Sequence, residues 1–188
     1  MCDRTEVRHR WFVKPNGPMW RTTSSSCPDT ERRLHSLAMM LRPIDLSDDM
    51  VTTRIVGIQK AAYRLEADLI GFDGIPQLHE SLDDLPIQDL DWLGSWEGDV
   101  FVGLIAWRKT ASGIEIDRLA VHPAYHRRGH GRALVESLLH RQPVTTSTGT
   151  GNEPAMRMYK SLGFRRAGLH EIAPDVTITE LHWVPPTR

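Results

Sequence analysis

Residues 119–139 read Leu-Ala-Val-His-Pro-Ala-Tyr-His-Arg-Arg-Gly-His-Gly-Arg-Ala-Leu-Val-Glu-Ser-Leu-Leu, an apolar strand end that passes through two glycines into an amphipathic helix. Gly129 and Gly131 allow a positive φ and a close approach of the backbone, so that amide groups can converge on an anion. The helix start adds its positive dipole end. Three arginines stand around the same turn, Arg127, Arg128 and Arg132. The segment predicts a pyrophosphate site, and an ordinary strand-to-helix connection stays the alternative.

A second motif lies downstream at residues 152–164, Asn-Glu-Pro-Ala-Met-Arg-Met-Tyr-Lys-Ser-Leu-Gly-Phe. Together the two segments resemble the GNAT superfamily of N-acetyltransferases, which bind acetyl-CoA. The first is similar to the family's pyrophosphate motif Gln/Arg-x-x-Gly-x-Gly/Ala, with His126 where Gln or Arg is usual. The second is similar to the signature Asn-x-x-Ala-x-x-x-Tyr-x-x-x-Gly-Phe, matched at Asn152, Ala155, Tyr159, Gly163 and Phe164.

Composition narrows the class of protein. The 188 residues suffice for one domain with a real core. A net charge of −1 gives no field that attracts nucleic acid, and no apolar run reaches the roughly 18 residues of a membrane span. The two cysteines, Cys2 and Cys27, indicate neither a disulfide framework nor a thiolate metal site. Without a leader pattern at its start, we expect a cytoplasmic protein, monomer or homodimer, with neither nucleic acid nor membrane as partner.

The chain divides into two parts. Residues 1–38 show no sustained period and carry several prolines and serines, so we expect a flexible or poorly structured extension. Residues 39–188 carry the GNAT-like domain. It opens with a strand near 41–44 and a helix whose predicted apolar stripe is Val51, Ile55, Ile58, Ala62 and Leu65. A second helix is expected after Pro76, and its predicted apolar face is Leu78, Leu82 and Leu85.

Strands and helices alternate along the rest of the domain. A hairpin is predicted over 90–96 and 100–108, and a strand over 114–121 leads into the glycine turn. After the helix that follows, we expect a strand over 143–148, the short helix of the second motif and two closing strands up to residue 183. The fold class is α/β, a mixed sheet of about seven strands flanked by helices. The resemblance implies that this sheet is centrally splayed, as in the acyl-CoA N-acyltransferase fold.

The resemblance also implies a cofactor site. Backbone groups of Leu119, Ala120 and Val121 are expected to bind the pantetheine arm and the acetyl carbonyl, although Leu119 and Val121 also suit an ordinary core. The other expected cofactor residues are Arg127, Arg128, Gly129, His130, Gly131, Arg132, Asn152 and Tyr159. Asn152 has a competing role, because asparagine is a preferred helix N-cap.

Tyr159 falls at the family's tyrosine position, which implies a general acid that protonates the departing thiolate. A phenol has a reference pKa of about 10 and a thiol of about 8.5, so donation is favourable only when concerted with departure. Ala155, Tyr159 and Leu162 also recur at i, i+4 and i+7, as on any core-facing helix. A half-buried aromatic residue is therefore the alternative.

The general base is assigned less directly. Some family members carry a glutamate four residues before the position of Leu119, and Glu115 stands there; another family position holds Ser147, which cannot act as a base. Glu115 or Asp117 can act through water, but a charged residue on the solvent face of a strand is the commoner explanation.

Two further clusters of residues bear on a metal site and on the acceptor. His122, His126 and His130 recur at fours, but Pro123 and the glycines prevent a continuous helix, so no metal site is expected. Acidic residues gather in the first two predicted helices and their loop, at Glu66, Asp68, Asp73, Glu80, Asp83 and Asp84. They favour a cationic acceptor such as a polyamine, an amino sugar or a peptide amine, or else form a solvated helix face.

These observations predict an acetyl-CoA-dependent N-acetyltransferase that acetylates a primary amine of a small molecule or peptide. The amine is expected to attack directly in a ternary complex, with no metal. The alternative is a non-catalytic acyl-CoA-binding sensor or interaction module of the same fold. A nucleic-acid binder centred on the three arginines is disfavoured by the near-neutral charge.

Overall fold

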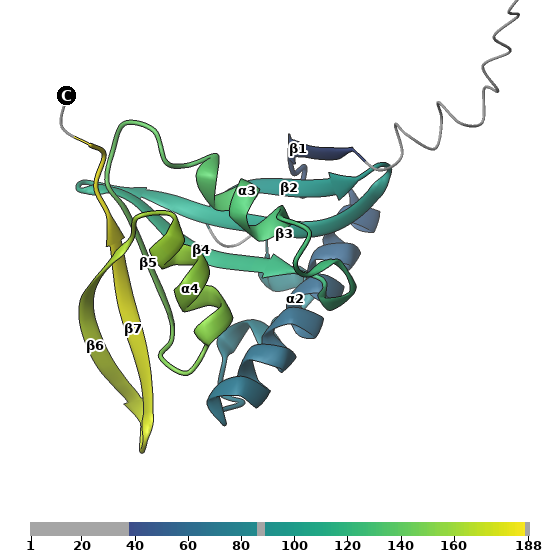
Figure 1. Cartoon of the computed structure of the whole chain (residues 1–188). Helices are drawn as coiled ribbons and strands as arrows, with labels where there is room; N and C mark the ends of the chain where they lie inside the picture. The colour runs from purple at the N-terminus through teal and green to yellow at the C-terminus, as the bar shows by residue number, and fades with distance from the viewer. Residues whose placement is uncertain (1–37, 86–88, 187–188) are drawn as a thin grey trace, which may run out of the picture.

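The computed structural model describes residues 38–85 and 89–186, which form a seven-stranded sheet with helices on both faces (Figure 1). The strands are β1 Met39–Pro43, β2 Asp91–Glu97, β3 Val100–Thr110, β4 Gly113–Val121, β5 Val144–Gly149, β6 Arg165–Ala173 and β7 Val176–Trp183. The α-helices are α2 Asp49–Ile70, α3 His130–Glu136 and α4 Glu153–Ser161. Short 3₁₀ turns are η1 Pro76–Leu78, η2 Leu82–Asp84 and η3 Pro123–Tyr125.

The sheet opens between its fourth and fifth strands in sequence. The strand order is β1-β2-β3-β4-β5-β7-β6, and β4 and β5 are the parallel pair in an otherwise antiparallel sheet. They pair only at Ile114 with Val144 and at Glu115 with Thr145, although β4 continues to Val121. In Figure 1 the two halves of the sheet fan apart beyond this point. The predicted mixed, centrally splayed sheet is therefore confirmed.

The core has two parts, one on each face of the sheet. On β3, Leu104 and Ala106 pack with Ile55 of α2, whereas Ile105 between them packs with Leu134 of α3. Successive side chains of a strand point to opposite faces, so a strand covered on both sides is apolar at nearly every position. This arrangement explains the continuous apolar run of β3.

Helix α2 is capped at both ends, but its buried face differs in part from the predicted stripe. The Asp48 carboxylate accepts hydrogen bonds from the backbone N–H groups of Met50 (2.9 Å) and Val51 (3.2 Å), and Gly71 ends the helix with φ 68°. Ile55 and Ile58 are buried as predicted, but Leu65 is 40% exposed. Val51 and Ala62 pack against the core as predicted, and the stripe was wrong only at Leu65. The buried face continues instead through Gln59, Tyr63 and Ala67.

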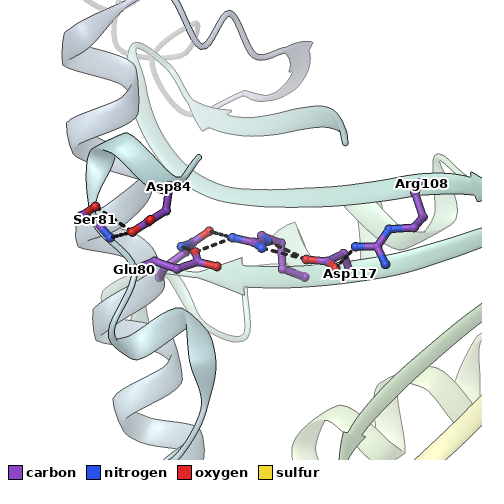
Figure 2. A network of polar contacts seen from close by, with 7 residues as sticks. Glu80, Ser81, Asp84, Arg108 and Asp117 are labelled. Atoms are coloured by element: carbon purple, nitrogen blue, oxygen red, sulfur yellow. Dashed lines mark hydrogen bonds and ion pairs between the residues drawn. The ribbon is translucent and has the colours of Figure 1, made fainter. Parts of the chain in front are cut away.

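The predicted second helix is absent from the described residues after Pro76, where the chain forms the separate turns η1 and η2. The Asp84 carboxylate accepts hydrogen bonds from the backbone N–H and the hydroxyl of Ser81, both at 2.7 Å (Figure 2). Such local side-chain bonds compete with continuous helical bonding. Leu78 and Leu85 are buried, but Leu82 is 44% exposed, so the predicted apolar face was wrong there.

The remaining elements follow the sequence closely. The hairpin turns at Gly98 (φ 61°), the glycine turn follows β4, and α4 ends before Gly163 in the left-handed region (φ 91°). Among residues 38–85 and 89–186, no helix has the length and apolar character to cross a membrane. Residues 1–37 of the predicted extension lie outside the described residues, so the domain boundary stays a prediction.

Candidate functional site

Two cavities meet where the sheet opens. The larger cavity, about 650 Å³, lies between α2, the glycine turn after β4 and helix α4. The smaller cavity, about 490 Å³, lies between the end of α2, the segment 72–77, β4 and β5. Both are lined by the same five residues at their junction, Tyr63, Glu66, Leu119, Asn152 and Ala155. A molecule that fills both cavities therefore passes the open edge of β4.

The predicted backbone contacts of β4 lie beside this junction. Leu119 lines both cavities and Val121 lines the larger one, while Ala120 is 1% exposed and packs in the core with Ile55. Pairing of β4 with β5 ends at Glu115, so the β4 backbone beyond it faces the gap between the strands. Unpaired backbone groups at such an edge can bind an extended ligand.

The glycine turn lines the larger cavity through Gly129, His130, Gly131 and Arg132. Gly129 caps α3 with φ 91°, and Arg127 also has a positive φ, 64°. Of the two glycines that allow a positive φ, only Gly129 adopts it. A Cβ atom at Gly131 would lie 3.6 Å from Met158 Sδ, which is an ordinary van der Waals distance. The first amides of a helix have no partner within it, so this turn can bind an anion.

The three predicted arginines separate. Arg127 and Arg132 line the larger cavity, and Arg132 also donates to Ser161 Oγ at 2.8 Å. Arg128 is not among the described lining residues, because its guanidinium pairs with Glu97 at 2.7 Å and stacks on the Tyr125 ring at 5.0 Å. The structure thus brings two of the three arginines to the predicted anion site.

His130 contributes its backbone rather than its ring. The side chain is 2% exposed, with Nδ1 2.8 Å from Ser95 Oγ and Nε2 3.2 Å from Glu97 Oε2. The ring therefore ties the start of α3 to β2. The other two histidines of the series have separate partners: His122 Nδ1 accepts from the Ala124 N–H, and His126 Nε2 lies 2.8 Å from the Val121 carbonyl.

No group of three or more His, Cys, Asp or Glu residues suited to a metal occurs in the described part of the chain. The prediction that the protein uses no metal stays a prediction.

Tyr159 lines the smaller cavity. Its side chain is 3% exposed and packs edge-on against Phe164, with ring centroids 5.1 Å apart. Burial raises the pKa of Tyr159 to about 12, although a hydrogen bond with the Thr146 side chain opposes the shift. The phenol therefore keeps its proton at neutral pH and is available as a hydrogen-bond donor. The alternative, a half-buried aromatic residue, was wrong in its degree of burial, and the donor role stays a prediction.

Asn152 caps its helix, as the sequence allows. Its Oδ1 accepts from the Ala155 N–H at 3.2 Å, and its Nδ2 donates to Thr148 Oγ1 at 3.4 Å. The side chain also lines both cavities. The capping role is confirmed, and the cofactor contact stays a prediction.

Glu115 lies at the closed end of the β4–β5 pairing. Its carboxylate is 45% exposed and 3.9 Å from the Arg108 guanidinium, and it is not among the described residues that line either cavity. This position does not support the predicted role as general base. Asp117 does line the smaller cavity, but its carboxylate pairs with both Arg118 and Arg108.

The sequence did not single out Glu66 or Tyr63, both on α2, as residues that line the site. Glu66 Oε1 accepts hydrogen bonds from Thr148 Oγ1 (3.0 Å) and from the Gly149 N–H (3.3 Å), which joins α2 to β5 at the junction. Burial raises the pKa of Tyr63 above its ordinary value, and the nearby Glu66 charge adds to the shift. The acidic bias of this region was visible in the sequence, but no local signal distinguishes Glu66 from its neighbours.

Arg118 is a buried cation at the wall of the smaller cavity. Its Nη1 lies 2.6 Å from Glu80 Oε2, its Nη2 lies 2.8 Å from Asp117 Oδ2, and its Cζ lies 5.3 Å from the Trp92 ring centroid. Figure 2 shows Glu80, Asp117 and Arg108 in one row of polar contacts. Burial lowers the pKa of Arg118, but the bonds with Glu80 and Asp117 outweigh it and leave the pKa raised.

Known proteins share this architecture. Residues 92–166 match the family model described as an acetyltransferase (GNAT) domain. The ribosomal-protein-S18-alanine N-acetyltransferase of Escherichia coli superposes with a TM-score of 0.62 at 14% identity, over 80% of this chain and 96% of that one. The Salmonella typhimurium protein yncA, solved with its cofactor acetyl-CoA, superposes with a TM-score of 0.59 at 18% identity, over 80% and 96%.

The sheet, with its open edge at β4, has the fold of the GNAT acyltransferases. The match to the GNAT family model over residues 92–166 and the similarity of fold agree with the resemblance that the two motifs indicated. It is also 29% identical, over 150 residues, to UPF0157 protein YqkA of Bacillus subtilis (strain 168). That match covers 78% of this chain but only 44% of the relative, so the chain spans less than half of that protein's length.

Proposed function

We propose that the protein is an acetyl-CoA-dependent N-acetyltransferase that transfers an acetyl group to a primary amine by direct attack in a ternary complex. The observation that carries the proposal is the meeting of two cavities at the open edge of β4, beside Leu119. One cavity then holds the acyl donor and the other the amine. The acceptor class, a small molecule or a peptide, and the cytoplasmic location belong to the same proposal.

The larger cavity suits the donor. In this proposal the amides of the turn at Gly129 and Gly131 bind the pyrophosphate, with Arg127 and Arg132 beside it. The backbone of β4 from Leu119 to Val121 binds the extended arm along the edge that β5 leaves open. When bound, acetyl-CoA supplies an activated acetyl thioester, whose carbonyl is polarised by backbone N–H donors.

Tyr159 is proposed to hold the proton that the departing thiolate receives. A buried phenol with a pKa of about 12 is protonated at neutral pH, and the side chain stands in the smaller cavity next to the junction. Tyr159→Phe removes this proton without changing the packing volume greatly. We expect amine-dependent thiol release to fall by about 10²-fold or more, while the affinity for acetyl-CoA stays within a few fold.

Calorimetric titration with acetyl-CoA tests the donor site. Gly129 is a poor place to block it, because its φ of 91° strains any substituted side chain. Gly131→Glu instead aims a carboxylate into the larger cavity from a position with ordinary contacts. Gly57→Glu is the matched control, since Gly57 lies on the exposed side of α2 with no atom within 4 Å of a built Cβ. We expect micromolar binding by the wild type and the control, and none by Gly131→Glu.

The alternative function is a non-catalytic acyl-CoA sensor. It predicts the same calorimetric result, so the release of free thiol in the presence of an amine panel separates the two. Thiol release that needs an amine and is slowed by Tyr159→Phe supports the enzyme. Tight acetyl-CoA binding with no amine-dependent release supports the sensor, and absence of binding by a folded wild type removes both.

A further inference from the structure

The carboxylate of Glu66, which lines the smaller cavity, accepts hydrogen bonds through one of its two oxygens. Glu66 Oε1 is bound by Thr148 Oγ1 and by the Gly149 N–H. Neither of these bonds uses Oε2, and Glu66 forms no ion pair with the described residues. Because Glu66 lines both cavities, its second oxygen is available at the place where donor and acceptor meet.

The other charges of this cavity neutralise one another. Its remaining charged lining residues are Asp117 and Arg118, which pair at 2.8 Å. Arg118 also pairs with Glu80, and Asp117 with Arg108, so both of these lining charges have partners of opposite sign. Glu66 is therefore the carboxylate that gives the cavity its negative charge, and that charge suits a ligand with a single cation.

One side of the remaining wall is apolar. It includes Ile70, Phe72, Ile75, Pro76, Ile172 and Ile178, whereas the polar lining residues are Gln77, Thr146, Ser147, Thr148 and Asn152, three of them on β5. The apolar residues come from the end of α2, the segment after it and the strands β6 and β7. An amino sugar or a polyamine would leave its hydroxyls or its further charges against this surface, which is costly. An amine on an apolar body matches both the charge and the wall.

We infer that Glu66 binds the ammonium group of the acceptor and that the acceptor is a monoamine carried on an apolar body. The inference rests on the proposed function and names the substrate class of the same site. The ammonium nitrogen contacts Glu66 Oε2 at the junction and releases one proton to water before the neutral amine attacks the thioester, and the apolar body lies along Phe72, Ile75 and Ile178. Glu66 is then the residue that selects the acceptor, through both its charge and its position.

The test measures amine binding directly, so that it does not depend on turnover. The full chain with CoA bound is titrated with 2-phenylethylamine, ethylamine, spermidine and glucosamine. We expect 2-phenylethylamine to bind at least tenfold more tightly than each of the others, since burial of its ring adds apolar area that ethylamine lacks. Equal or tighter binding of spermidine or glucosamine overturns the substrate class.

Variants then test Glu66 itself. Glu66→Gln keeps the Oε1 acceptor for Thr148 and Gly149 but removes the charge, and we expect 2-phenylethylamine affinity to fall by about 10- to 100-fold. Asp68→Asn is the matched control, because Asp68 is an exposed carboxylate on the same helix outside both sets of lining residues. It should leave the affinity within about twofold. Glu66→Gln behaving like Asp68→Asn, with a thermal midpoint unchanged, overturns the role of Glu66.

The acetyl-CoA affinity of each variant separates this inference from the proposal beneath it. Wild type and Glu66→Gln that bind acetyl-CoA equally, but differ in amine affinity, support both. If acetyl-CoA binds and the amine preference is absent, the inference fails and the proposed function stands. If acetyl-CoA does not bind to the folded wild type, both fail.

Discussion

Arg118 Nη1 lies 2.6 Å from Glu80 Oε2, although one residue belongs to β4 and the other to the link between η1 and η2. The same guanidinium bonds to Gln59 Oε1 of α2 at 3.2 Å. Three separate segments therefore meet at one buried cation. Because the segment that ends at Glu80 also supplies Phe72 and Ile75 to the smaller cavity, this contact fixes one wall of the proposed acceptor site.

Glu80→Ala should destabilise the protein by about 3 kcal/mol, since breaking a buried ion pair leaves a charge poorly compensated. The Arg118 side chain is only 2% exposed and that of Glu80 12%. The free energy of unfolding in urea measures the effect. Glu153→Ala is the control, because the Glu153–Arg157 pair is 75% and 68% exposed and should contribute under about 1 kcal/mol. Equal losses in the two variants would contradict the structural role of Arg118.

Gly129→Ala and Gly131→Ala should differ in stability although only one residue separates them. Gly129 has φ 91°, where an L-residue is strained, so alanine there should cost about 1–2 kcal/mol. Gly131 has no such constraint, and its new Cβ would meet Met158 Sδ and Val121 Cγ2 at 3.6 Å. We expect a change below about 0.5 kcal/mol at Gly131. Thermal and urea unfolding of both variants check the difference, and the reverse order would refute it.

Ser95→Ala should destabilise the start of α3. It removes the partner of His130 Nδ1 in a region where Ser95 is fully buried and His130 is 2% exposed. A buried group left without its hydrogen bond costs about 1–3 kcal/mol. Since His130 begins the helix that follows Gly129, acetyl-CoA affinity should fall as well. Ser112→Ala, at an exposed turn, is the control and should change neither quantity.

Tyr159→Phe should make the protein less sensitive to alkaline pH. The folded pKa of Tyr159 is raised to about 12, above its ordinary value of 10, because burial disfavours the phenolate. The unfolded chain therefore loses this proton first, and the stabilisation present below pH 10 is lost as the pH rises toward 12. Between pH 8 and pH 11 the wild type should lose about 1 kcal/mol more than the variant. Urea unfolding at the two pH values measures this, and parallel losses would contradict the assignment.

Local sequence signals predicted most of the elements correctly. Asp48 and Asn152 cap their helices, Gly98 turns the hairpin and Gly163 follows the end of α4, because each of these roles depends on a residue's own conformational preference or hydrogen bonds. The strands were predicted from runs of apolar and β-branched residues, which are also a local property of the chain. The predicted helix after Pro76 failed, since Ser81 and Asp84 bond locally in a way that the spacing of three leucines does not reveal.

The sequence by itself determined the order of the elements, the glycine turn and the GNAT-like fold, because these depend on short motifs and on periodicity along the chain. Only the tertiary structure decided which side chains face the cavities. Arg128 and the ring of His130 turn away to Glu97, whereas Glu66 reaches Thr148 from 82 positions away. Such choices depend on packing between distant segments and on the pairing of buried charges, which no local pattern encodes.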